Sequence, residues 1–158
     1  MLLKLQFKGL KKQKKSYSGK KKTHTLKVQA IIHCKTQQIL SLCMSKGAVH
    51  DFELFKRNLH LVPTNSFILE DKGYQGIYTI YPNSLLPCKA KKHCELDPLL
   101  KTYNREINKR RIGIEHVFRT LKTFKILAER YRNRSKKFVL RFNFIAGIYN
   151  LELSKSEL

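Results

Sequence analysis

Acidic residues are scarce in this sequence, and none occurs before residue 51. Asp and Glu number 11 against 33 Lys and Arg, which gives a formal net charge of +22 over 158 residues. A compact domain with this charge repels itself and attracts polyanions. We therefore expect a partner that carries negative charge, and DNA or RNA is the leading candidate.

Long apolar runs and closely paired cysteines are also missing. No run approaches the roughly 18 apolar residues of a membrane-spanning helix, and the first residues are too short and interrupted for a secretory signal. We expect no membrane partner and a cytoplasmic location. Cys34, Cys43, Cys88 and Cys94 form no CxxC pair. The spacing from Cys88 to Cys94, with His93 alongside, is a poor match to zinc-ligand spacing. The pattern favours reduced thiols over a metal site.

Length and apolar content suit a single folded domain. Hydrophobic residues make up 42% of the chain, and a chain of this size can bury roughly 70% of its unfolded surface. The lysine-rich stretch at residues 8–22 is typical of a solvated loop or of an arm that contacts phosphates. We divide the chain into a basic segment, residues 1–22, containing a remnant strand and a lysine-rich loop, and one domain over residues 23–153.

Alternation of apolar and polar residues predicts strands in the first half of the chain. Residues 3–7 alternate weakly, residues 24–33 alternate strongly, and residues 37–44 follow a link short enough for a hairpin. Residues 66–71 form an apolar run that ends in acids. This run predicts a buried strand whose carboxyl end opens at Asp71.

Helical periodicity dominates the second half of the chain. Residues 51–58 predict a short helix with acids in its first turn, and a long helix starts where Asp97 precedes a proline. A last helix is expected over about residues 136–153, and residues 77–96 are expected to be irregular. The two expected apolar faces are Ile107, Ile114, Phe118 and Leu121, and Phe138, Phe142, Ile145 and Tyr149. This order of elements predicts an α/β or α+β fold.

Two acids are candidates for chemistry. Asp71 follows the expected buried strand, where an acid can project into a crevice, although a turn role is about as common. Glu115 lies within the long helix, one turn from Arg111 and Arg119 and close to Lys122. These residues form surface ion pairs, or they present a metal-binding carboxylate and phosphate-binding cations to DNA. The residues alone leave both interpretations open.

Several short motifs occur in a fixed order between about residues 11 and 151. They are Tyr17-Ser-Gly-Lys-Lys-Lys, Gly47-Ala-Val-His-Asp51, Asp71-Lys-Gly-Tyr-Gln-Gly76, Asn104 with Arg111-Ile-Gly-Ile-Glu-His116, Leu121-Lys-Thr-Phe-Lys, and Arg130-Tyr-Arg-Asn133. The set resembles the DDE transposases of bacterial insertion sequences, and most closely their Harbinger-like branch, the DDE superfamily endonucleases of type 4. Each motif alone is weak, whereas their common order is specific.

The resemblance implies an RNase H-like fold and three acids that hold two Mg²⁺ or Mn²⁺ ions during phosphoryl transfer on DNA. Asp71 matches the second Asp and Glu115 matches the Glu. His50 and Asp51 match a motif to which we assign a structural role or a supporting role behind the ligands. The implied contacts to DNA phosphates are Lys20, Lys21, Lys22, Arg111, Arg119 and Lys122. The implied partners are transposon-end and target DNA, and further transposase subunits.

The sequence departs from this family at its beginning. The family's first Asp precedes the basic segment at a spacing that falls near Met1, where no acid occurs. We expect a mixed sheet flanked by helices that is truncated at its N-terminal central strand, with residues 1–7 as a partial substitute. Two carboxylates bind Mg²⁺ weakly, so we expect no activity from this chain alone. It is then a decayed remnant or the downstream product of a frame-split gene.

Two other classes of function fit the charge. The first is a non-catalytic basic protein that binds nucleic acid, as ribosomal or chromosome-coating proteins do, but it leaves the order of the motifs unexplained. The second is a dominant-negative partner of an intact transposase. Loss of a central strand would also expose sheet edges, so we expect marginal stability or aggregation.

Overall fold

The computed structural model describes residues 2–6, 17–18, 23–71, 73–74, 76–90, 95–129 and 137–156, with side chains described from Leu26 onward. Within these residues the chain is mixed α/β, as the sequence predicts. The lysine-rich stretch lies almost entirely outside the described residues, so the division at residue 22 stays a prediction.

The larger sheet is built around one strand, β3 (Thr23–Ile32). Each of the other strands in this sheet pairs with it antiparallel: β1 (Leu2–Gln6), β2 (Tyr17–Ser18) and β4 (Ile39–Lys46). The predicted hairpin is confirmed, with Ile32 opposite Ile39. The strand β4 starts two residues later than predicted, and Gln37 in the turn before it has a φ of 58°.

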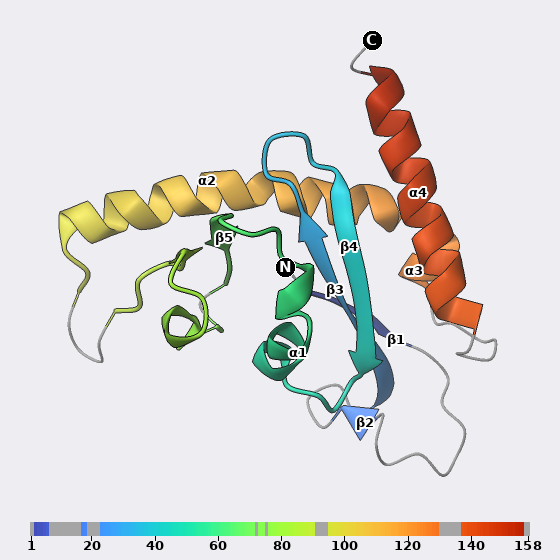
Figure 1. The fold of residues 1–158 in the computed structure, drawn as a ribbon, viewed down its shortest axis with the longest axis horizontal. Coiled ribbons are helices and arrows are strands. Elements are labelled where there is room, and N and C mark those ends of the chain that lie inside the picture. The colour runs from blue at the N-terminus through green and yellow to red at the C-terminus, as the bar shows by residue number, and fades with distance from the viewer. Residues whose placement is uncertain are drawn as a thin grey trace.

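One face of the larger sheet packs against two long helices, α2 (Pro98–Leu121) and α4 (Phe138–Ser156) (Figure 1). Both predicted apolar faces are buried, and all of their residues except Ile107 share one core with Val28 and Ala30 of β3. The Asp97 carboxylate accepts the Leu99 backbone N–H at 2.8 Å, which confirms the predicted start of α2. A short helix, α3 (Lys125–Ala128), was not predicted and contributes Leu127 to this core.

The opposite face of β3 is covered by α1 (Asp51–Arg57). A smaller apolar cluster forms beyond it from Phe55, Tyr74, Ile77 and Leu86. The remaining short elements are η2 (Leu59–Leu61), β5 (Ile68–Leu69), η3 (Ile77–Thr79) and β6 (Ser84–Leu85). The predicted irregular region is therefore irregular only in part, since η3 and β6 lie within it and β6 pairs with β5 in parallel.

Two asparagine side chains each form a pair of hydrogen bonds, one donated and one accepted, with the backbone of a distant residue; we call each such pair a clamp. The Asn150 amide of α4 accepts from Ile39 N and donates to Ile39 O, each at 2.9 Å. The buried Asn104 amide of α2 accepts from Cys88 N at 2.7 Å and donates to Cys88 O at 3.0 Å. Each clamp satisfies an otherwise unpaired backbone unit and sets the position of a helix. Within the described ranges, no helix is long and apolar enough to cross a membrane.

Two phenylalanines of α4 test which helix face holds the core. Phe142 is fully buried and Phe144 is 70% exposed. We predict that Phe142→Ala lowers the free energy of unfolding by about 3–5 kcal/mol, whereas Phe144→Ala changes it by less than about 0.5 kcal/mol. Urea denaturation of the two variants checks this, and equal losses would contradict the assigned core.

Candidate functional site

Asp71 lies just beyond the carboxyl end of β5. The ladder with β6 continues through Glu70, whose N–H donates to Leu85 O at 3.1 Å. The chain then turns, with Tyr74 N donating to Asp71 O at 3.0 Å and Gly76 in the left-handed region at a φ of 84°. This turn leaves the Asp71 side chain 57% exposed. Asp71 thus follows a strand as predicted, but the prediction of a buried strand over residues 66–71 was wrong, because β5 is only Ile68–Leu69 and both residues are half-buried.

Arg111 of α2 brings two sequence-distant motifs together. Its Nη1 lies 3.4 Å from Asp71 Oδ1, and its side chain is only 18% exposed. The separation is longer than a well-formed hydrogen bond, so this contact is mainly electrostatic. The guanidinium thus offsets the Asp71 charge where β5 meets α2.

Glu115 is exposed and follows Arg111 by four residues on α2. Residues four apart in a helix lie on the same face, so Glu115 is one turn along from the cation that contacts Asp71. Arg119 and Lys122 continue the spacing and are also exposed. Four residues therefore follow one another along one side of α2 and its C-cap. They are Arg111, which contacts Asp71, then Glu115, and then the exposed cations Arg119 and Lys122.

Glu70, next to Asp71, is a buried acid that the sequence reasoning did not single out. It is 5% exposed, and its Oε2 has no hydrogen-bond partner among the described residues. Burial raises the pKa of this carboxyl, while the nearby Arg111 charge opposes that shift. The buried Tyr74 hydroxyl also lacks a partner in the described part of the chain, and burial together with Glu70 raises its pKa. The only sequence signal for Glu70 was its place at the end of an apolar run.

His50 and Asp51 hold the start of α1 against β3. His50 Nδ1 accepts the Phe52 N–H at 3.3 Å, which caps the helix. Asp51 Oδ1 lies 2.6 Å from Lys27 Nζ, and Lys27 also donates to the Val49 carbonyl. The Lys27 side chain is only 9% exposed, so these two acceptors stabilise its positive charge in place of water.

The structure describes the predicted phosphate-contacting lysines and the predicted thiols only in part. Lys20, Lys21 and Lys22 lie outside the described residues. Where the structure describes them, the cysteines Cys34, Cys43 and Cys88 are free thiols.

The described acids do not complete a metal site. No group of three or more His, Cys, Asp or Glu side chains that could hold a metal ion occurs in the described ranges. Asp71 and Glu115 are oxygen donors of the kind that Mg²⁺ prefers, but Asp71 faces a guanidinium. Asp71 and Glu115 therefore offer carboxylate oxygens on neighbouring elements, and no third such side chain is grouped with them in the described ranges.

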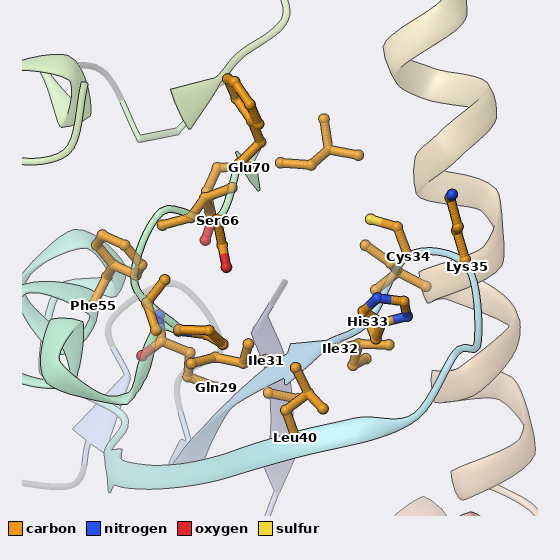
Figure 2. A pocket seen from close by; sticks show the side chains of 17 residues that line it. Gln29, Ile31, Ile32, His33, Cys34, Lys35, Leu40, Phe55, Ser66 and Glu70 are labelled. Atoms are coloured by element: carbon orange, nitrogen blue, oxygen red, sulfur yellow. The ribbon is translucent and has the colours of Figure 1, made fainter. Parts of the chain in front are cut away.

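A cavity of about 740 Å³ lies beside this site (Figure 2). Its wall includes residues 29–35 of β3 and the turn after it, residues 66–70 around β5, and Leu40 of β4. Figure 2 shows Ser66 and Glu70 on one side of the cavity and Gln29, Ile31 and Ile32 on the other. The lining is mostly apolar, with Glu70 as its buried acid.

The Lys27–Asp51 contact yields a stability test. Asp51→Ala leaves a nearly buried ammonium without its carboxylate, and we predict a loss of about 2 kcal/mol in unfolding free energy. The control is Glu53→Ala on the same helix, which breaks an exposed pair with Arg57 and should cost less than about 0.5 kcal/mol. Chemical denaturation measures both variants, and similar losses would refute the special role of Asp51.

Comparison with known proteins places the chain in one protein family. The family described as DDE superfamily endonuclease matches residues 4–150. A curated protein of Microchaete diplosiphon, "Probable transposase for insertion sequence element IS702", is 51% identical over 144 residues. This alignment covers 91% of the present chain and 52% of the relative, so the chain spans about half the length of the curated relative it matches. No solved structure matches the chain. The predicted resemblance to this family is confirmed, and the chain belongs to the DDE superfamily endonucleases.

Proposed function

We propose that this chain is part of an RNase H-like transposase catalytic domain, in which Asp71 and Glu115 are two of the acids of a divalent-metal site for DNA cleavage and strand transfer. The contact between Arg111 and Asp71 carries the proposal. It brings the end of β5 and the middle of α2 together, so that Glu115 follows one helical turn away. Two motifs that the sequence separates widely thus share one surface.

The arrangement of strands supports the RNase H-like part of the proposal. Antiparallel strands around β3, a separate parallel pair and a long helix carrying the last acid all belong to one mixed assembly. The acid at the end of β5 and the acid on α2 come from different elements, as expected where a crevice forms at the carboxyl ends of strands.

The incomplete ligand set limits what residues 1–158 do by themselves. In this family Mg²⁺ or Mn²⁺ supplies activation of the attacking oxygen and stabilisation of the leaving one. Two carboxylates, one of them beside a guanidinium, hold such an ion weakly. We therefore propose that this chain binds DNA but does not cut it unaided.

We assign binding of DNA phosphates to two exposed cations at the C-terminal end of α2, Arg119 in the last turn and Lys122 at the C-cap. Arg119 and Lys122 lie on the same side of the helix as Glu115 and make no ion pair in the described part of the structure. With the net charge of +22, they favour a polyanion along this face. A non-catalytic nucleic-acid-binding protein is the second candidate, since the same charge supports it.

Nicking of supercoiled DNA separates catalysis from binding. We predict that the chain with Mg²⁺ or Mn²⁺ nicks no faster than Glu115→Gln. The matched control, Glu106→Gln, alters another exposed acid of α2 and should behave like both. Metal-dependent nicking that survives in Glu106→Gln and disappears in Glu115→Gln would show that the chain is active alone, against the proposal.

Salt dependence tests the assigned DNA face. Removing both Arg119 and Lys122 by alanine substitution should weaken binding and reduce the slope of log K against log salt by about 2, because each phosphate contact contributes about 0.9. Lys155→Ala, at an exposed cation of α4, is the control and should change the slope by less than the double substitution does. Fluorescence anisotropy over a salt series measures this, and an unchanged slope in the double variant contradicts the assignment.

A further inference from the structure

Helix α4 is apolar on its outer side as well as on the side that faces the core. Its inner side packs in the shared core, where Phe142 and Tyr149 are buried. On its outer side, Leu140 is 71% exposed, Phe144 70% and Leu151 56%. Figure 1 shows α4 at the edge of the fold, with α2 and the sheet on one side of it. A helix that is apolar on both sides is normally covered on both, and no described residue covers this outer side.

The outer residues form a straight line along α4. Four residues, which we call the α4 stripe, are separated by four, three and four positions: Leu140, Phe144, Gly147 and Leu151. This is the heptad spacing of helices that pack against one another along a shared seam. The stripe therefore has the pattern of a surface that receives another helix.

Gly147 has no packing role within the described fold. The residue is exposed, and a Cβ added to it would meet no atom within 4 Å. Glycine inside a helix lowers the stability of the helix relative to alanine, so a glycine in this place usually marks a close approach by another segment. A second helix that crosses α4 at Gly147 would account for it.

Charge limits what can cover the α4 stripe. Helix α4 carries two cations and one acid, a net charge of +1, in a chain whose formal charge is +22. Helix α2, by contrast, carries six cations and two acids. A polyanion therefore has little to bind at α4. For the same reason, two copies of this basic chain would meet with less repulsion at α4 than at α2.

The stripe is complementary to itself in one orientation. In an antiparallel pair centred between residues 145 and 146, Phe144 of each copy lies opposite Gly147 of the other, and Leu140 lies opposite Leu151. Each ring then fills the open space beside a glycine. A parallel pair would instead place ring against ring and glycine against glycine, which crowds one level of the seam and leaves the next one empty.

The exposed area sets the strength of such a pair. At about 200 Å² for an aromatic side chain and rather less for leucine, the stripe exposes on the order of 400 Å² per copy. Pairing would bury roughly 800 Å² of it, and flanking residues would add to this, which is at the small end of specific interfaces. We therefore expect reversible association with a Kd of about 10–100 μM.

We propose that the α4 stripe is a homodimerisation surface, on which a second copy of the chain docks its own α4 antiparallel with each Phe144 against the other copy's Gly147. The pair is symmetric, so the same contact closes it and no longer assembly grows from it. The proposal rests on the surface of α4 and does not depend on metal binding or on DNA cleavage.

Sedimentation velocity of the full 158-residue chain over about 1–300 μM tests the association. Phe144→Lys buries an ammonium group in the seam of each copy and should raise the Kd by at least about tenfold. The matched control is Leu99→Lys, which adds the same charge at a residue of α2 that is 79% exposed and should leave the Kd within about twofold. Circular dichroism verifies that both variants fold.

An exchange of the two central residues tests the orientation. Phe144→Gly removes the ring and Gly147→Phe sets two rings against each other, so each change alone should raise the Kd by about five- to tenfold. The double variant again pairs a ring with a glycine in the antiparallel arrangement, and its Kd should return to within about threefold of the original. A double variant that associates more weakly than both single ones contradicts this arrangement.

Salt distinguishes this association from binding to DNA. Raising NaCl from about 0.1 to 0.5 M should lower the Kd of the dimer by roughly two- to fivefold, because it screens the repulsion between two strongly basic copies. Binding to DNA should weaken over the same range, since it depends on contacts with phosphates.

The proposal fails on any of three results. The first is a chain that stays monomeric up to about 300 μM at the higher salt concentration. The second is an equal loss of association in Leu99→Lys. The third is a monomeric chain that floats with phosphatidylglycerol vesicles and ceases to do so in Phe144→Lys, since this would assign the stripe to a membrane surface.

Discussion

The burial of β3 on both faces is the constraint on which the rest of the described structure depends. Every described strand of the larger sheet pairs with β3, and its alternate side chains enter two different environments. Val28 and Ala30 face the core under α2 and α4, while Lys27 and Gln29 are covered by α1. Because the second face buries an ammonium group, α1 must begin with a carboxylate in reach, and Asp51 provides it.

Four acids of this basic chain are placed at structural junctions. Asp51 joins α1 to β3, Asp71 meets Arg111 between β5 and α2, and Asp97 caps α2. Glu70 is buried at the edge of the cavity. The large excess of positive charge is therefore left on the surface, where it is available to a polyanion.

Family membership and catalytic competence are separate conclusions here. Identity of 51% over most of the chain shows that it shares ancestry with insertion-sequence transposases. Activity depends instead on how many oxygen donors converge on one place. The described residues bring Asp71 to the α2 face that bears Glu115, yet they assemble no three-ligand group.

The sequence by itself determined the longer helices and strands, the buried faces of the two long helices, and the family. Periodicity predicted α2, α4, β3 and β4, because apolar spacing and caps such as Asp97 act within a few residues. Only the tertiary structure decided that Lys27 and Glu70 are buried, that Arg111 meets Asp71, and that β5 pairs with β6 in parallel. These features depend on segments that are far apart along the chain. No local pattern encodes which distant segment will cover a given side chain, so they emerged only from the packing of the sheets against α1 and α2.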